Sequence, residues 1–475
     1  MISYRKIFYA TGAIFFVLAA AMAIPALADW SSSRNTSSCF VIGGIFCCFI
    51  GGLLFFSNQT QESIFLNLRE RILTVLISWI SVPILASIPL IISPLEISKA
   101  DCFFEITSAL TTTGATVVPD LKNFSEGFLL WRSMLQLLGG VGFITSCLYV
   151  FANFLAPISF ERNNFSKNSD LPHQLKIILT AYLIAALTGS IMLTGSGISS
   201  VDSLCYSLDA ISSGGVLISD VNYATASKIT IWVLSTLMFV SGISATFIKN
   251  LTYNGFSAFK DRQFICYISI IAVCAAFLAA YIASFSDASI LESLGTAVLA
   301  ITSSVTTTGV TVPLPESFAA FTDAFIYALN FCGGCSGSCT GGIKIFRIMM
   351  IFLLIKSYLI RLVKTNAIYI PTYAGRKLDE IDVTGLLSYF SCYMIFVILT
   401  SLILTVSDLE FGKAFNAVIT SINNNGPFFG LRRATMAEIS ELSSFAKIIL
   451  TISMVVGRIE FISFFVVFIK PFWKK

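Results

Sequence analysis

A short polar stretch ending in glycine occurs four times in this chain, at intervals of about 100 residues. The first copy is Thr111–Gly114, and each copy follows a full-length apolar run and then a half-length one. Hydroxyl or amide residues ending in glycine make a poor helix, so each copy is predicted to be a loop. The four glycines are Gly114, Gly215, Gly309 and Gly426. Duplication on this scale predicts four equivalent units, which can close around a single axis.

The composition decides the environment in which these loops lie. Of the 475 residues, 56% are hydrophobic and 12% are charged, and the mean hydropathy of +0.85 excludes an ordinary soluble protein. Inside a membrane, irregular backbone survives only where it lines water or is buried in protein. Four polar loops around one axis therefore predict a pore, in which carbonyl oxygens and small hydroxyls replace the water around a dehydrated cation. The net charge of +4 gives no support for nucleic-acid binding.

The lengths of the apolar runs predict an all-α integral membrane protein with ten transmembrane helices, since about 20 residues cross the hydrocarbon core. Each of four repeats consists of an outer helix, a pore half-helix, the polar loop and an inner helix. An N-terminal transmembrane hairpin occupies residues 1–68, and the pore repeats occupy 69–160, 161–258, 259–365 and 366–475. Spanning helices are predicted at 7–28, 39–56, 72–93, 128–155, 174–195, 229–250, 263–285, 322–360, 383–406 and 444–470. The half-helices, too short to cross, are predicted at 101–110, 202–211, 290–305 and 410–422.

The first apolar run has two interpretations. It ends in Ala26-Leu27-Ala28, which mimics a signal-peptidase site. However, the run exceeds the ~7–15 residues of a signal core, and a second apolar run begins near Cys39. We therefore prefer a retained hairpin to a cleaved signal peptide.

Basic residues in the short loops set the orientation, because cytoplasmic loops are enriched in Lys and Arg. Arg69, Arg71, Arg361 and Lys364 belong to the richer side, which places both termini in the cytoplasm and brings the half-helices in from outside. The negative end of each half-helix dipole then points at the middle of the pore and favours cations. Acidic residues near the half-helix starts either cap these helices or concentrate cations at the mouth; they are Asp101, Glu105, Asp202, Glu292 and Glu410.

Three further motifs accompany the four loops. They are Leu138–Gly142 after the first loop, Gly333–Ser338 with Gly341–Lys344 in the third repeat, and Gly457–Glu460 in the last helix. With the loops, this set resembles the Trk/Ktr/HKT superfamily of potassium transport proteins, most closely its TrkH family, over nearly the whole chain and including the N-terminal hairpin.

The resemblance implies that the four loops form a potassium selectivity filter. The ring glycines and the two residues before each would bind the ion: Thr112, Thr113, Gly114, Ser213, Gly214, Gly215, Thr307, Thr308, Gly309, Asn424, Asn425 and Gly426. In this superfamily a serine at the first ring position accompanies sodium permeation, so four glycines favour potassium. Departures from fourfold symmetry at Ser213, Gly214 and the Asn run imply less strict selectivity than in symmetric tetrameric channels. Potassium is the substrate, and no cofactor is expected.

The resemblance also implies two gating elements, formed by Gly333, Gly334, Gly337, Gly341, Gly342 and Arg458. The glycine-rich stretch interrupts a helix and would block the pathway below the filter; tight helix packing through small residues is the alternative. A phosphate-binding loop fits poorly, because Lys344 is out of register with the P-loop spacing. A metal site also fits poorly. Cys332, Cys335 and Cys339 lack a fourth metal ligand. Arg458 would repel cations in the pore, or would form a structural ion pair with Glu460 or with an acid on a neighbouring helix.

The expected function is potassium uptake across a bacterial inner membrane through a channel-like pore. The alternative is a secondary transporter that couples potassium to protons or sodium. No enzymatic activity is expected, because no nucleophile–base set, zinc spacing or nucleotide motif is present, and the only histidine, His173, lies in a predicted cytoplasmic loop. The resemblance implies a homodimer in membrane lipid and a separate cytoplasmic nucleotide-binding RCK subunit of the TrkA type. No nucleic-acid partner is expected.

Overall fold

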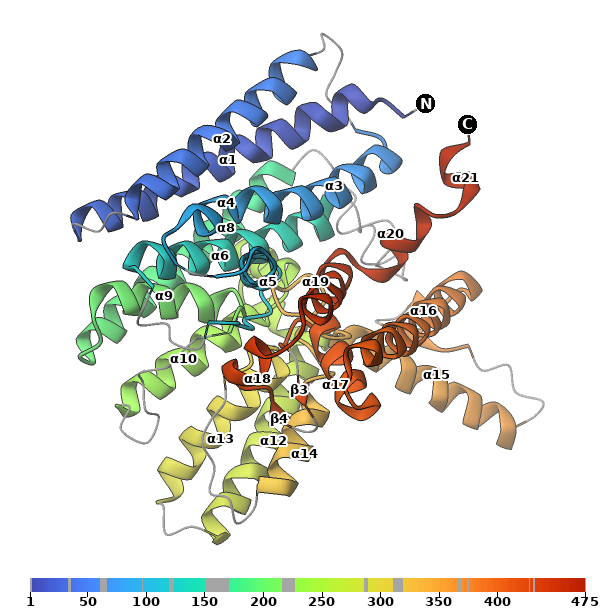
Figure 1. Ribbon diagram of the computed structural model, residues 1–475. Coiled ribbons are helices and arrows are strands. Elements are labelled where there is room, and N and C mark those ends of the chain that lie inside the picture. Colours follow the sequence, from blue (N-terminus) through green and yellow to red (C-terminus); the bar gives the residue numbers. More distant parts are fainter. Residues whose placement is uncertain are drawn as a thin grey trace.

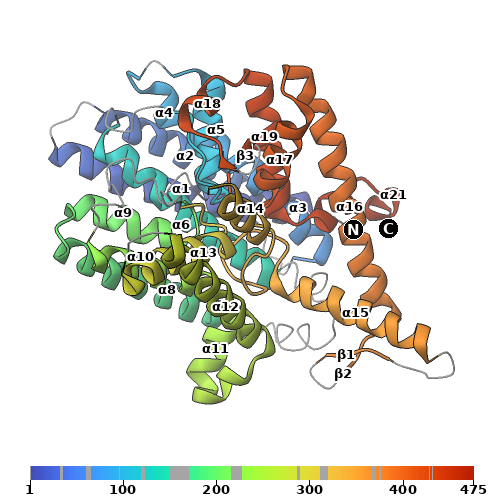
Figure 2. The same ribbon diagram turned by 90° about the horizontal axis from the view of Figure 1, so that it is seen from below.

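The computed structural model describes thirteen stretches of the chain, and nearly all of their length is helical (Figure 1). These stretches are residues 2–32, 36–59, 66–95, 97–118, 124–149, 171–215, 227–285, 289–310, 319–364, 370–373, 376–426, 428–429 and 432–474. The chain passes around the molecule in sequence order, from blue through green and yellow to red. The two termini lie side by side in both views (Figures 1 and 2).

The N-terminal hairpin consists of α1 (Tyr4–Ser31) and α2 (Ser37–Ser57). Helix α1 continues through the residues that resemble a cleavage site and ends beside a fully buried carboxylate, Asp29. This carboxylate accepts hydrogen bonds from the backbone amide of Gly127 at 2.7 Å, from Ser125 Oγ at 2.8 Å and from Thr36 Oγ1 at 2.6 Å. The hairpin is therefore fastened to the start of the first inner helix.

Asp29→Asn should lower the temperature of thermal unfolding in detergent. Hydrogen bonds to a charged acceptor contribute roughly 1.5–3 kcal/mol each, and the amide replaces one acceptor oxygen with a donor that faces other donors. Size-exclusion chromatography at increasing temperature measures this change. Ser31→Ala, which removes an exposed hydroxyl bonded to Ala28 O, is the control and should behave as the wild type. Equal stability of Asp29→Asn would contradict the anchoring role.

The elements follow the predicted order in every repeat. The first contains α3 (Leu68–Ala86), α4 (Ile88–Ile92), the half-helix α5 (Lys99–Leu110) and α6 (Glu126–Tyr149). The second contains α8 (Leu171–Gly195), the half-helix α9 (Ser200–Ile211), α10 (Lys228–Ser241), α11 (Ala245–Asn254) and a 3-10 turn (Gly255–Lys260). The third contains α12 (Arg262–Phe285), the half-helix α13 (Ile290–Val305), α14 (Ala319–Leu329) and α15 (Ile345–Val363). The hairpin of β1 (Thr372–Tyr373) and β2 (Arg376–Lys377) lies at the start of the fourth. The fourth contains α16 (Glu380–Leu404), a 3-10 turn (Thr405–Ser407), the half-helix α17 (Phe411–Ile422), β3 (Phe428–Phe429), β4 (Arg432–Arg433), α18 (Met436–Ser440), α19 (Ser444–Ile459), α20 (Phe461–Val466) and α21 (Lys470–Trp473).

Serine side chains start three of the half-helices. Ser98, Ser199 and Ser289 each accept a hydrogen bond from the backbone amide three residues later. The residue at that third position is acidic, as Asp101, Asp202 or Glu292. A serine cap followed by a carboxylate in the first turn satisfies free amides and complements the positive end of the helix dipole. These carboxylates therefore stabilise the helix starts.

Inner helices are broken where single helices were predicted at 229–250 and 444–470, and both of those predictions are wrong. Helices α10 and α11 meet at an angle of 91° around Gly242–Ser244. Helix α19 ends at Glu460, which has φ 71° and ψ 126°. The predicted interruption of 322–360 is present between α14 and α15. Among the described residues seven helices are long and apolar enough to cross a membrane, or eight if the bent pair counts as one span. The number of ten crossings stays a prediction.

The four repeats form a closed ring. Three inner helices pack on the half-helix of the next repeat, as α6 on α9, α10 on α13 and α19 on α5. The third and fourth repeats meet where Tyr327 of α14 donates a hydrogen bond to Asn416 Oδ1 of α17 at 2.6 Å. Because α19 belongs to the last repeat and α5 to the first, the ring closes on itself. The ends of the four half-helices are thereby brought to the centre.

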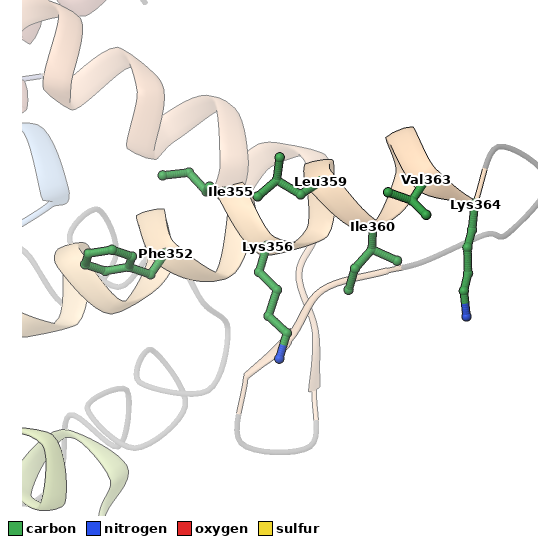
Figure 3. Close-up of a pocket in the computed structure, with 7 residues that line it drawn as sticks. All are labelled: Phe352, Ile355, Lys356, Leu359, Ile360, Val363 and Lys364. Atoms are coloured by element: carbon green, nitrogen blue, oxygen red, sulfur yellow. The ribbon is translucent and has the colours of Figure 1, made fainter.

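One helix and the short β-hairpin that follows it extend away from this ring. Helix α15 and the β1–β2 hairpin project from the body at the lower right of Figure 2. A shallow pocket lies on α15, lined by Phe352, Ile355, Lys356, Leu359, Ile360, Val363 and Lys364 (Figure 3). It lies on the exposed face of the helix and contains none of the predicted site residues.

Candidate functional site

All four half-helices end in the same hydrogen-bonded structure. In the first, the amide of Thr112 donates to Ala109 O at 3.0 Å, and the amide of Thr113 donates to Ser108 O at 2.8 Å. This pair of bonds is a Schellman motif, the C-terminal cap that turns a chain sharply out of a helix. Equivalent pairs end α9, α13 and α17 at Ser213 and Gly214, Thr307 and Thr308, and Asn424 and Asn425.

The backbone of the four loops alternates in handedness. The cap residues Thr112, Ser213 and Thr307 have φ 56°, and Asn424 has φ 54°. Two residues later, the four ring glycines again have positive φ, between 70° and 82°. A threonine with positive φ is uncommon and costs of order 1–3 kcal/mol. Two such threonines, with a serine and an asparagine in the equivalent positions, indicate that the loop conformation is imposed by its surroundings.

In three of the repeats, a side chain in the last turn of the half-helix anchors the segment that leaves the loop. Ser108 Oγ donates to Ala115 O at 2.7 Å, and Ser303 Oγ donates to Val310 O at 3.1 Å. In the fourth repeat, Thr420 Oγ1 accepts from the amide of Phe428 at 3.1 Å. In the second repeat this position is Asp209, whose carboxylate lies 3.9 Å from Arg132.

The loops of different repeats are in direct contact. A Cβ atom on Gly114 would lie 2.3 Å from the carbonyl oxygen of Gly214, so only glycine fits between the first and second loops. Between the fourth and first repeats, Asn424 Nδ2 donates to Thr113 Oγ1 at 3.2 Å. The first loop thus contacts the second and the fourth directly. Of the twelve predicted filter residues, all are buried except Gly309, which is partly exposed.

The departure from fourfold symmetry in the second repeat has a steric cause. Gly214 stands where the other repeats have Thr113, Thr308 and Asn425. The side chain of Gln136, on α6, occupies the space beside it, and a Cβ on Gly214 would lie 2.1 Å from Gln136 Oε1. The glutamine therefore takes the place of the side chain that the other three repeats carry in their own loops.

The glycine-rich stretch between α14 and α15 lies directly against three of the four loops. The amide of Gly341 donates to Thr307 Oγ1 at 2.8 Å, and the amide of Gly342 donates to Asn423 O at 3.0 Å. Ser213 Oγ donates to Cys339 O at 3.2 Å. This stretch thus contacts the second, third and fourth repeats at once. Its backbone is non-helical, so the alternative of tight packing between regular helices does not apply.

Lys344 stabilises the non-helical conformation of the glycine-rich stretch through hydrogen bonds. Its buried ammonium donates to the backbone oxygen of Thr340 and to Thr340 Oγ1, the latter at 3.0 Å. Thr340 Oγ1 also accepts from the amide of Gly334 at 2.9 Å. The lysine has φ 75° and ψ 134°, close to the values of Glu460 at the break in the fourth inner helix. The inner helices of the third and fourth repeats therefore bend at two charged residues of opposite sign.

Arg458 is buried, and among the residues that the structure describes it forms no ion pair, which was the alternative to a pore role. Glu460 binds Arg347 instead, with 2.7 Å between Oε2 and Nη2. Within the described part of the chain, none of the three guanidinium nitrogens of Arg458 has a hydrogen-bond partner. The guanidinium lies over the ring of Phe143 on α6, 4.5 Å from its centroid. Lys344 Nζ is 5.1 Å from the centroid of the same ring, so two positive charges face one part of the interior.

Sequence reasoning missed the buried charges behind the first two loops. Arg132 Nε lies 3.0 Å from Glu105 Oε1, and Glu105 Oε2 accepts from the amide of Val117 at 3.0 Å. The prediction that Glu105 caps a helix or lies at the mouth is therefore wrong, because this side chain is buried in the middle of α5. The available signal was Arg132 itself, a charge inside an apolar helix. In the part of the chain that the structure describes, no group of three or more His, Cys, Asp or Glu side chains could hold a metal ion.

Comparison with known proteins gives consistent results over the full length. The profile of the TrkH family, described as cation transport proteins, matches residues 36–248 and 225–475. The Trk system potassium uptake protein TrkH of Salmonella typhimurium is 26% identical over 493 residues, covering 99% of this chain and 100% of that protein. The protein TrkI of Halomonas elongata is 25% identical and covers 84% of this chain and 83% of its own length. The crystal structure of the potassium transporter TrkH from Vibrio parahaemolyticus superposes with a TM-score of 0.88 at 25% identity, covering both chains completely.

Proposed function

The chain belongs to the TrkH family of cation transport proteins, and from this premise we propose that it takes up potassium through a channel-like pore. The observation that carries the proposal is the fourfold loop structure at the ends of the half-helices. The residues before each ring glycine lie just beyond the capped end of the half-helix, where the chain turns out of the helix. Held in place by the caps, their carbonyl groups are suited to replace the hydration shell of a potassium ion.

The proposed ligands are the twelve filter residues named from the sequence. The half-helices support this assignment because their C-terminal ends meet at the loops, and the negative dipole ends favour a cation there. The relatives TrkI and TrkH are named as potassium uptake proteins. This agrees with the preference for potassium expected from a ring of four glycines. The fully enclosed contact between Gly114 and Gly214 gives the ring little room to accommodate another residue.

The proposed gate consists of the glycine-rich stretch and Arg458. Hydrogen bonds from Gly341 and Gly342 to the filter loops support a position at the inner end of the filter. The unpaired guanidinium supports a barrier to cations on the same path. We also propose that the protein lies in a bacterial inner membrane with both termini in the cytoplasm. It would form a homodimer and bind a separate regulatory subunit of the TrkA type. The adjacent termini support an even number of crossings, with both ends of the chain on one side of the membrane.

Uptake of potassium, rubidium and sodium into uptake-deficient cells that express this chain tests the proposal. We expect growth at low potassium and faster uptake of potassium and rubidium than of sodium. Failure of the folded protein to restore potassium uptake would reject the function. Reversal potentials in reconstituted bilayers separate the alternative, since coupling to protons would make them shift with pH at constant potassium.

Thr340→Val should raise resting potassium flux about threefold to tenfold while leaving ion preference unchanged. The substitution keeps the shape but removes the oxygen that binds Gly334 N and Lys344 Nζ, and one or two lost hydrogen bonds shift a two-state gate by this amount. Flux into liposomes per folded protein measures it. Thr236→Val, at an exposed threonine of α10, is the control. Reduced selectivity without a gain in flux would place this stretch in the filter rather than the gate.

A further inference from the structure

Polar contacts join the repeats at all four seams of the ring, but their positions differ. Lys447 of α19 binds Asp101 of α5 with 2.6 Å between Nζ and Oδ1, and Lys228 of α10 binds Glu292 of α13 at 3.1 Å. Both acids lie in the first turn of their half-helices, far from the loops. The contact between α14 and α17 is the neutral pair of Tyr327 and Asn416.

The seam between the first and second repeats places its charges at the opposite end. Asp209 lies in the last turn of α9, six residues before Gly215. Arg132 reaches both half-helices, with Nε at 3.0 Å from Glu105 of α5 and Nη1 at 3.9 Å from Asp209 of α9. The three side chains are between 3% and 7% exposed, so water screens these charges little.

This arrangement connects Arg132 to both loops. Glu105 accepts the hydrogen bond from Val117 on the strand that leaves the first loop. Asp209 O accepts the capping hydrogen bond from Gly214 in the second loop. One turn further along α6, Gln136 packs against Gly214. A single face of α6 therefore supports the first two loops where Gly114 touches Gly214.

We infer that Arg132 is a positioning residue for ion preference, because it holds the first and second filter loops at a fixed separation through Glu105 and Asp209. The inference rests on the proposed function. A filter distinguishes potassium from the smaller sodium ion by the number and placement of its oxygens, so a change in the distance between two of four loops alters that distinction. The guanidinium fork is essential here, because an ammonium cannot span two acids in the same geometry.

Arg132→Lys is expected to lower the ratio of potassium to sodium flux about threefold to tenfold, in protein that remains folded. The charge is retained, but one of the two carboxylates loses its partner, so part of the restraint on the separation of the two loops is lost. Glu105→Gln, which keeps the shape and weakens the link to Arg132, should change the ratio in the same direction. Reversal potentials in mixed potassium and sodium solutions measure the ratio without depending on the amount of protein.

Glu292→Gln provides the matched control, since it breaks an inter-repeat ion pair at the far end of a half-helix. It should leave the ratio at the wild-type value. A wild-type ratio in the folded fraction of either Arg132→Lys or Glu105→Gln would overturn the inference while leaving the proposed function intact. A wild-type protein without potassium preference would instead reject the proposed function. An equal fall in ratio for Glu292→Gln would show a general effect of ring stability and would also overturn the role of Arg132.

Discussion

Gly114→Ser is expected to reduce the ratio of potassium to sodium flux by about tenfold or more. The glycine has φ 70°, where a residue with a side chain is strained by about 1–2 kcal/mol. The added Cβ would also lie 2.3 Å from Gly214 O and 2.8 Å from Gly215 Cα. Both neighbours are backbone atoms of the second filter loop, so relief requires that this loop move. The carbonyl ring then loses the spacing that suits potassium.

The measurement is the reversal potential in mixed salts, accompanied by the yield of monodisperse protein. Gly385→Ser is the control, because a Cβ on Gly385 in α16 would have no atom within 4 Å and its φ is ordinary. The control should match the wild type in both quantities. An unchanged ratio for Gly114→Ser would contradict the assignment of Gly114 to the ring.

Arg458→Ala is expected to increase potassium flux strongly. A guanidinium stays protonated under physiological conditions, so in the proposed pathway its positive charge would oppose every passing cation. At ~6 Å and an effective dielectric constant of ~20, this repulsion is roughly 3 kcal/mol, which water in the pathway would reduce. A barrier of this size corresponds to about a hundredfold in rate at most. Because Glu460 is paired with Arg347, it keeps its partner when Arg458 is removed.

Arg458→Lys separates charge from shape in the same experiment. The lysine retains the positive charge, so most of the barrier should remain. Flux per folded protein in liposomes should therefore rise for the alanine variant and change little for the lysine variant. A folded Arg458→Ala protein with wild-type flux would remove Arg458 from the mechanism.

The sequence was sufficient for the half-helices and their loops, because length and hydroxyl content are local properties. The predicted half-helix 290–305 agrees with α13, and the other three differ by one or two residues at their starts. The break at Glu460 was not predictable, since apolar residues flank it on both sides and a left-handed glutamate has no local signal. The positive φ of Thr112 even contradicts the preference of a β-branched residue.

The contacts that Gln136 and Arg132 make behind the loops depend on tertiary structure, and they leave no periodic pattern in the sequence. Nothing near Gly214 in the chain indicates that Gln136 would fill the space beside it. Arg132 could be recognised as an unusual charge in an apolar helix, but its two partners come from different half-helices. Local propensity specifies which segments form loops, whereas the surrounding tertiary structure specifies the strained backbone dihedral angles within those loops.

The closure of the ring by its last helix also determines the order in which the protein can mature. The ribosome completes Asp101 about 350 residues before Lys447, its partner across the final seam. At ~5–20 residues per second, the first half-helix waits roughly 20–70 s in the membrane before α19 is made. During that interval the earlier repeats can assemble side by side only as an open arc. A chain that terminates prematurely before α19 would therefore insert its first helices and still lack the contact between α19 and α5 that closes the ring.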